Sequence, residues 1–314
     1  MLHLRLIVPT DRTDEVLRLV RDTVGTTHLV VLPGVAHDPQ GDVVMCDVAR
    51  EAGDDLIGAL RGLGIDREGS ITLENMDLTL SAFADKAEAD APGEGSDAVL
   101  WEELTKATDE ESTFSITYVA FMAVATMLAA CGVMLDNSIL IVGAMAVGPD
   151  FGPLAGISTA IVQRAPRLVV RSLWALIGGF ASAMALTAGF AWMMNAFGLF
   201  TMQMIEADRP NTSFIWQPNW MSFVVAFLAG IAGTLSLTSA KSGALIGVAI
   251  SVTTVPAAAN AAVAFNYRDY AQTWGSVGQL MANLGGIVLA GTLTLLVQKA
   301  LQSARRRRTP QPAG

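Results

Sequence analysis

Residues 138–166 read SILIVGAMAVGPDFGPLAGISTAIVQRAP. This stretch is long and apolar enough to cross a bilayer, which requires about 20 residues. Its middle nevertheless holds two glycines, two prolines and a carboxylate, all of which disfavour a helix interior in lipid. These residues are Gly148, Pro149, Asp150, Gly152 and Pro153. Since non-helical backbone in a membrane is tolerated only where protein covers it or water solvates it, we predict two half-helices that meet at a polar point inside a helical bundle.

Composition separates the chain into an acidic part and an apolar part. Charged residues make up 16% of the 314 residues, and the mean hydropathy is +0.46, whereas soluble proteins carry about 25% charged residues. Residues 1–112 hold 9 basic and 24 acidic side chains, and residues 113–314 hold 11 basic and 5 acidic ones. The acidic balance of the first part argues against nucleic acid as a partner. Cys46 and Cys131 fall one in each part and are interpreted as unpaired core thiols.

Residues 1–81 are predicted to form a cytoplasmic ferredoxin-like domain with the element order βαββαβ. Apolar and polar residues alternate in four segments, as in half-buried strands, and two segments between them have helical spacing. The strand segments are residues 2–8, 27–32, 42–48 and 70–80. This order is typical of an antiparallel sheet with two helices on one face. Because no basic start with an apolar core precedes the domain, we expect the N-terminus in the cytoplasm.

Three further regions follow in the sequence. Residues 82–112 are rich in Ala, Asp and Glu and are predicted to be a flexible acidic linker that ends in a juxtamembrane helix. In that helix, Val99, Leu100, Trp101 and Leu104 either form a contact face or belong to a solvated helix, and we favour the solvated helix. Residues 113–301 are predicted to be a transmembrane domain, and residues 302–314 a basic cytoplasmic tail.

The transmembrane domain contains six apolar stretches of near-spanning length. They are residues 114–134, 138–162, 173–197, 221–238, 243–265 and 277–301. The basic connections, including Arg164, Arg167 and Arg171, all fall on the side of both termini. The positive-inside rule therefore predicts a multi-pass protein of the cytoplasmic (inner) membrane with cytoplasmic N- and C-termini.

The two halves of this domain resemble each other. Pro149 and Pro256 have the same separation in sequence as the glycine pairs that begin at Gly178 and Gly285. A repeat unit of three spans would invert the second unit relative to the first, as in the 3+3 inverted repeats with broken helices of many secondary transporters. Small-residue faces such as Gly178 and Ser182 let helices approach closely, either within one chain or in a homo-oligomer, and we favour packing within the chain.

The candidate site follows from the two interruptions. Asp150 either accepts a proton or ligates a cation, or it caps the second half-helix, and these roles are compatible. Polar residues near the second interruption and on the last span either bind solute or bond across helices, and we favour bonds across helices. They are Thr253, Thr254, Asn260, Gln279 and Asn283, together with Pro256 itself.

The short motifs around the two prolines suggest a family. A βαββαβ domain is followed by GAM through Pro149 at 143–149 and by GVAI through Pro256 at 247–256. This arrangement resembles the uncharacterised "hydrophobic domain" family of prokaryotic membrane proteins, one of the domains of unknown function. The resemblance implies the fold and topology given above, and it implies no catalytic residues.

Two hypotheses of function remain. The leading one is a secondary transporter or channel-like permease for a small polar or ionic solute, gated by the N-terminal domain. The alternative is a membrane-anchored small-molecule sensor that uses the ferredoxin-like domain. An enzyme is not expected, since no histidine follows His37 and no HExxH motif occurs. We expect no metal or other cofactor, apart from a proton or sodium as coupling ion. The expected partners are membrane lipid and the solute.

Overall fold

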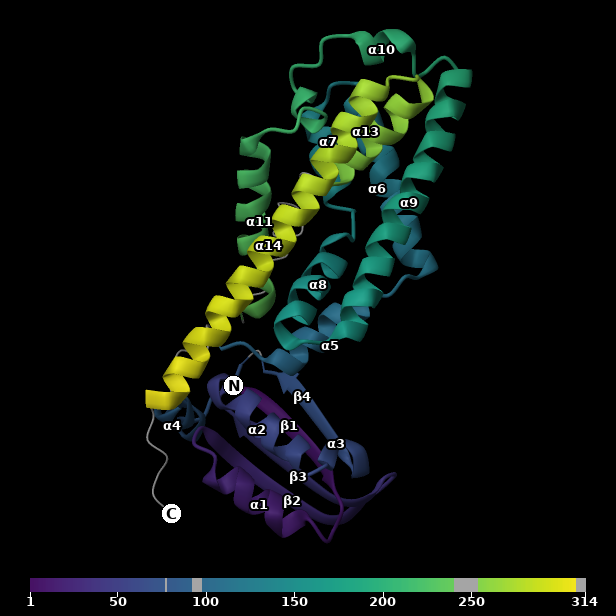
Figure 1. The fold of residues 1–314 in the computed structure, drawn as a ribbon. Helices are drawn as coiled ribbons and strands as arrows, with labels where there is room; N and C mark the ends of the chain where they lie inside the picture. Colours follow the sequence, from purple (N-terminus) through teal and green to yellow (C-terminus); the bar gives the residue numbers. More distant parts are fainter. Residues whose placement is uncertain (77, 92–97, 240–253, 309–314) are drawn as a thin grey trace. The chain divides into compact units, whose positions relative to one another are not determined.

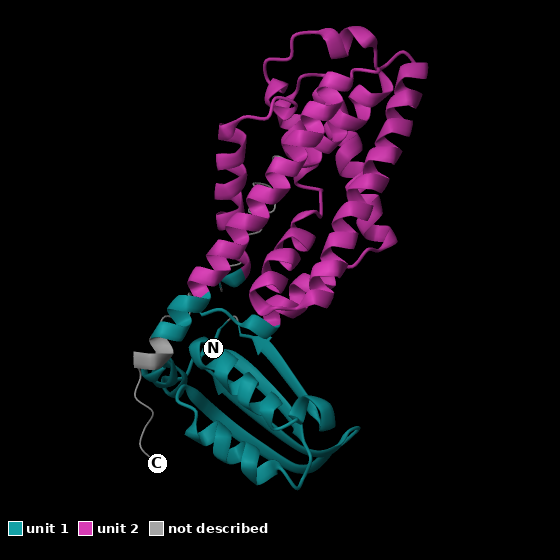
Figure 2. Ribbon diagram, viewed as in Figure 1, with its two compact units in different colours: residues 1–102, 238–241, 299–314 teal, residues 103–237, 242–298 magenta. Residues whose placement is uncertain are grey.

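A computed structural model of the chain describes residues 1–76, 78–91, 98–239 and 254–308. The chain forms two compact units, which Figure 2 shows in different colours. The first unit is built from Met1–Glu102, a short segment that begins at Thr238, and the C-terminal segment that begins at Lys299. The second unit is built from Glu103–Leu237 and the segment that ends at Gln298.

The first unit contains a four-stranded sheet in the order β2-β3-β1-β4, in which every neighbouring pair is antiparallel. The strands are β1 (Leu2–Val8), β2 (Thr26–His37), β3 (Gln40–Val48) and β4 (Ser70–Asn75). This strand order is that of a split βαβ sandwich. The predicted antiparallel-sheet domain is therefore confirmed.

Two helices, α1 (Thr13–Asp22) and α2 (Arg50–Gly62), cover one face of this sheet (Figure 1). Alternate residues of β1 point at them and are almost fully buried, as the period of a strand requires. The core of the unit consists of Leu2, Leu4, Leu6, Val16, Val20, Val44, Cys46, Leu56 and Leu60, among others. A short helix, α3 (Ile65–Glu68), lies between α2 and β4 and was not predicted.

The first unit extends beyond the predicted boundary at Ser81. The prediction of a flexible linker is wrong for residues 82–90, which form α4 (Ala82–Asp90). The Ser81 side chain caps this helix by accepting hydrogen bonds from the amides of Phe83 and Ala84, at 3.2 and 3.4 Å. The composition of this segment suits a helix as well as a linker, and the cap together with two buried alanines favours the helix.

The predicted contact face before the membrane is buried, so our preference for a solvated helix is wrong. Leu100 packs in the core of the sheet domain and is 3% exposed. Trp101 donates from Nε1 to Oε1 of Gln302 at 2.9 Å, and Nζ of Lys299 lies 5.5 Å from the centre of its ring. The C-terminal end of the last helix is therefore part of the first unit.

The second unit consists of helices. In chain order they are α5 (Trp101–Glu111, which begins in the first unit), α6 (Ile116–Met134), α7 (Ser138–Met145), α8 (Phe151–Gln163), α9 (Pro166–Ala196), α10 (Met202–Glu206), the 3-10 helix η2 (Ser213–Ile215), α11 (Trp220–Thr238), α13 (Val255–Asn266) and α14 (Tyr270–Arg308, which ends in the first unit). Among the described residues, α6, α9, α11 and α14 are long and apolar enough to cross a membrane. The chain is thus a membrane protein.

The second and fifth predicted spans differ from these four. Residues 138–162 form the two helices α7 and α8 and not one continuous helix. Of residues 243–265, the structure describes only those from Thr254 onward. The predicted arrangement of six spans in two repeats therefore stays a prediction.

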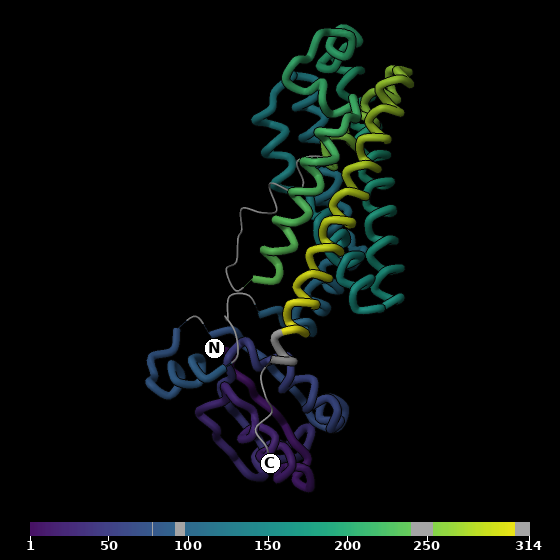
Figure 3. The backbone as a smooth tube through the Cα atoms, turned by 60° about the vertical axis from the view of Figure 1, so that its left-hand side comes forward, coloured from purple at the N-terminus to yellow at the C-terminus, as the bar shows by residue number. Residues whose placement is uncertain are grey.

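Glycines allow the helices of the second unit to approach closely. A Cβ atom on Gly230 of α11 would lie 2.7 Å from the carbonyl oxygen of Ile287 on α14. In agreement, α11 and α14 lie side by side in both Figure 1 and Figure 3. A Cβ on Gly179 of α9 would lie 2.6 Å from the ring of Tyr118 on α6. Such close approach at glycine is typical of packed membrane helices.

We expect Gly69→Ala to destabilise the first unit by about 1–3 kcal/mol, because the new Cβ would lie 1.9 Å from the carbonyl oxygen of Ile7. Cys46 provides a local probe, since burial and, less strongly, the charge of Asp47 raise the pKa of its thiol to about 12. In a Cys131→Ala background, urea should expose Cys46 to alkylation at a lower concentration in the Gly69→Ala chain.

The matched control is Gly58→Ala inside α2, where a Cβ meets nothing within 4 Å. This change should leave Cys46 protection unchanged or raise it slightly, since alanine is favoured over glycine in a helix by about 0.5–1 kcal/mol. Equal behaviour of the two variants would contradict the close contact at Gly69.

Candidate functional site

The candidate site begins at the gap between α7 and α8. The side chain of Asn137 caps α7 by accepting from the amides of Ile139 and Leu140, at 3.0 and 3.1 Å. Helix α7 ends at Met145 and α8 begins at Phe151. Pro149 lies in the gap, where it has no N–H to donate, and Pro153 lies in the first turn of α8, where proline is tolerated. Pro149 thus separates the two helices, and Pro153 is compatible with the start of α8.

Asp150 lies in this gap and is 0% exposed. It occupies the N-cap position of α8, but its side chain makes no capping hydrogen bond. It instead accepts a hydrogen bond from the hydroxyl of Thr254, the residue before α13. The capping role that the sequence allowed for Asp150 is therefore not observed. The two proline-containing segments, far apart in sequence, meet at this hydrogen bond. The bond stabilises the fold because burying an unpaired carboxylate is costly.

Helix α13 carries the site further into the bundle. Val255–Ala264 is buried throughout, and the helix packs against α6 and α9. Pro256 lies at its first turn, where proline is tolerated. Most of the remaining residues are alanines, which let the neighbouring helices come close. Asn260 is the polar side chain in this buried segment, and it lies about 9 Å along the helix from Thr254.

Asn260 joins a buried hydrogen-bond network. Its Nδ2 donates to Oγ of Ser276 on α14 at 2.7 Å, and its Oδ1 accepts from Nη1 of Arg209 at 3.4 Å. Nη2 of Arg209 donates to Oε1 of Gln272 at 2.5 Å. Nε2 of Gln272 donates to the carbonyl oxygen of Ile205 at 3.5 Å. The network therefore links α13 and α14 to the segment between α9 and α11.

Arg209 is a functional candidate that the sequence did not reveal. It lies in the connection between α9 and α11, where it counts only as a loop charge, yet it is 5% exposed. Burial lowers its pKa, and the carboxylates of Asp136 and Asp269 act in the opposite direction. Two neutral amides accept hydrogen bonds from the buried guanidinium, and the two carboxylates offset part of the cost of its burial. The guanidinium of Arg209 can donate hydrogen bonds to an anionic or carbonyl group.

A second polar pair lies on α14. Gln279 and Asn283, one turn apart, are both buried, and Nε2 of Gln279 donates to Oδ1 of Asn283 at 3.2 Å. Among the described residues, Oε1 of Gln279 has no hydrogen-bond partner. Gln279 also borders a cavity of about 240 Å³, which is large enough for several water molecules. This cavity is lined further by Phe214, Ile215, Asn219, Met221, Ser222 and Val225.

The structure brings together only some of the predicted site residues. Asp150 and Thr254 are in contact. Asn260 belongs to the separate network of Arg209, and Asn283 forms a hydrogen bond with Gln279. The remaining predicted residues lie close to the two ends of this arrangement. Gly148 and Pro149 are half-buried in the gap, Gly152 and Pro153 are buried in the first turn of α8, and Pro256 is buried in α13. Thr253 lies outside the described residues.

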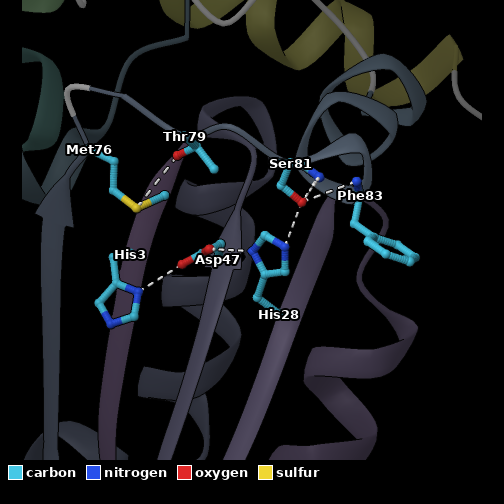
Figure 4. A network of polar contacts seen from close by, with 8 residues as sticks. His3, His28, Asp47, Met76, Thr79, Ser81 and Phe83 are labelled. Carbon is cyan, nitrogen blue, oxygen red and sulfur yellow. Dashed lines mark hydrogen bonds and ion pairs between the residues drawn. The ribbon is translucent and has the colours of Figure 1, made fainter.

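The first unit carries a separate polar cluster, which Figure 4 shows. Nδ1 of His3 and Nδ1 of His28 lie 2.7 and 2.6 Å from the two carboxylate oxygens of Asp47. Since a carboxylate accepts, each ring donates from Nδ1. Nε2 of His28 lies 2.9 Å from the hydroxyl of Ser81, the cap of α4. The cluster therefore connects the sheet to α4.

The backbone of His28 has a φ of 51°, which residues other than glycine rarely adopt. It lies where the register between β2 and β3 shifts, between Thr27 and Val30. The irregular strand turns the imidazole toward Asp47. Sequence patterns do not reveal this cluster because the three residues come from three different strands. Among the residues that the structure describes, no group of three or more His, Cys, Asp or Glu side chains is arranged to hold a metal ion.

A small antiparallel-sheet domain joined to apolar helices with buried polar groups defines an integral membrane protein. Residues 145–289, which include the gap before α8, α13 and much of α14, match the family model of a domain of unknown function, DUF389. This match confirms the predicted resemblance to an uncharacterised family.

A distant relative agrees with this assignment. The chain is 24% identical over 181 residues to the uncharacterized protein MJ0678 of Methanocaldococcus jannaschii. The aligned region covers 57% of this chain and 52% of that protein. The chain thus spans about half the length of this curated relative. No solved structure matches the chain.

We expect Thr254→Val to destabilise the second unit by about 1–3 kcal/mol, because it leaves the buried carboxylate of Asp150 without this donor. Thr159→Val is the matched control. Thr159 is 1% exposed, and its hydroxyl has no hydrogen-bond partner among the described residues. Thermal unfolding of the full chain in detergent should show a lower midpoint for Thr254→Val only. Equal midpoints for the two variants would contradict a stabilising role of the bond.

Proposed function

We propose that the chain is a secondary transporter or channel-like permease for a small polar or ionic solute, with both termini on the cytoplasmic side of a prokaryotic inner membrane. The solute site lies between the gap at Asp150 and the polar residues along α13. The observation that carries the proposal is the contact of a fully buried carboxylate with Thr254, at a gap between helices of an apolar bundle. Ionisable groups in such places commonly mark substrate or ion pathways.

The positions of the buried polar groups support this proposal. Asp150 and Thr254 lie at the start of α13, and Asn260 with Arg209 lies about 9 Å further along the same helix. The carboxylate of Asp150 and the guanidinium of Arg209 thus lie beside two different turns of α13. The carboxylate can bind a cation or proton, and the guanidinium can bind an anion. We propose that Asp150 takes up the coupling ion, a proton or sodium, and that the neighbouring polar groups hold the solute.

The inverted repeat belongs to this proposal. Under it, α7 and α8 of the first repeat correspond to the second proline-containing segment, which ends in α13. Helices interrupted in corresponding places of two repeats form the solute and ion sites of many secondary transporters.

A flux assay with the full chain in proteoliposomes tests the proposal. The solutes are sodium, potassium, chloride, phosphate, acetate and glycine, each measured against protein-free vesicles. We expect at least one solute to enter faster with protein present, and Asp150→Asn to reduce that flux at least tenfold, because the amide cannot exchange a proton. Thr159→Val, which lies outside the site, should retain the flux.

Two outcomes would contradict parts of the proposal. If Asp150→Asn carried the same flux as the unchanged chain, the coupling role of Asp150 would be abandoned. If no solute moved faster than in protein-free vesicles, the assignment as a transporter would fail for this set of solutes, and the sensor described next would be favoured.

We propose a membrane-anchored small-molecule sensor as the second candidate function. The observation that favours it is the cluster of His3, His28 and Asp47, which reaches the cap of α4 through Ser81. A ligand that replaced one of these bonds would change the capping of α4. The strained backbone of His28 is also typical of functional sites.

Thermal unfolding of the full chain with a panel of ions and metabolites separates the two functions. A ligand that binds only the folded state raises the unfolding free energy by about 2.7 kcal/mol at 100 times its Kd. Loss of this effect in Asp150→Asn alone supports the transporter. Loss in Asp47→Asn alone supports the sensor, and a ligand that needs neither residue contradicts both assignments of the site.

A further inference from the structure

A groove on the second unit lies apart from the polar residues of the candidate site. It runs along the first turns of α9 and has a volume of about 830 Å³, within the range of about 300–1,000 Å³ that is usual for ligand sites. We call it the α9 groove. Its lining includes Phe114, Arg167, Val170, Arg171, Trp174 and Gly178.

The register of α9 divides the groove into a basic part and an apolar part. Arg167 and Arg171 are four residues apart and therefore lie on one face of the helix. Val170, Trp174 and Gly178 follow the same spacing and continue toward the middle of α9. From Arg171 to Gly178 the helix rises about 10 Å. A ligand that fits both parts has a charged end and an apolar chain.

The basic part has an excess of positive charge. Nη1 of Arg171 lies 2.7 Å from a carboxylate oxygen of Asp109, and its Nη2 donates to Thr113. Arg167 is exposed and forms neither an ion pair nor a side-chain hydrogen bond with the residues that the structure describes. It also lies in the first turn of α9, where the helix dipole favours an anion. One guanidinium is thus available to a negatively charged group.

The apolar part is largely uncovered by the chain. Trp174 is 69% exposed, Val170 62% and Phe114 54%. A tryptophan near the end of a membrane helix typically lies at the level of the lipid headgroups. Contact with lipid chains would cover these side chains, whereas an inorganic anion at Arg167 would leave them uncovered.

We propose that the α9 groove binds one anionic phospholipid, with its phosphate on Arg167 and the first part of an acyl chain along Val170 and Trp174. The positive charge of the basic part selects an anionic headgroup over a zwitterionic one, whose ammonium group the arginines would repel. This inference is independent of the solute that the chain transports and of the proposed transport itself.

Native mass spectrometry of the full chain in detergent tests the proposal with two lipids that share the same acyl chains, a phosphatidylglycerol and a phosphatidylcholine. We expect the phosphatidylglycerol to bind more tightly, and Arg167→Gln to weaken its binding roughly fivefold. Trp174→Ala should weaken binding of both lipids, because the acyl contact is shared. The matched control is Arg21→Gln, which removes one exposed arginine from α1 in the first unit.

Three results would overturn the proposal. They are equal binding of the two lipids, equal phosphatidylglycerol binding by Arg167→Gln and Arg21→Gln, and complete displacement of the lipid by an equal concentration of glycerol phosphate. The last result would show that the apolar part contributes nothing and that a free phosphate is the ligand. Because Arg167 is exposed, its substitution should leave the thermal midpoint unchanged, so a loss of lipid binding will not reflect misfolding.

Discussion

The need to pair a buried carboxylate governs the arrangement of the second unit. Asp150 lies in the gap between α7 and α8, away from water, where an unpaired charge would cost several kcal/mol. Thr254 can donate to it only because α13 begins beside that gap. The alanines of α13 in turn permit the close approach to α6 and α9. The gap, the alanine-rich helix and the hydrogen bond therefore depend on one another.

The outer surfaces of the two units differ in polarity, although both units have an apolar core. In the first unit, alternate residues of β1 turn their apolar side chains to α1 and α2, and polar residues such as Arg5 face outward. In the second unit, large apolar residues such as Trp174 and Leu228 are exposed, while Asn260 and Ser276 are buried. This reversal is expected when lipid replaces water as the solvent of the outer surface.

Local patterns predicted the elements that depend on local periodicity. The alternation of residues 2–8 predicted β1, and Pro149 with Pro153 indicated that residues 138–166 would form two helices. The similarity of the two halves predicted a site between the two interruptions, but it did not predict the hydrogen bond of Asp150 with Thr254. Arg209 was missed because a charge in a connecting segment looks the same whether it faces water or folds back into the bundle. His28 was missed because its position depends on a register shift in the sheet.

The enclosure of α13 restricts the sequences that evolution can use there. With Val255–Ala264 buried on all sides, an added methylene at most of these positions meets a neighbouring helix. Outward residues of α9, by contrast, can exchange among large apolar types without loss of packing. Homologues should therefore diverge on the outer helices and keep small residues along α13.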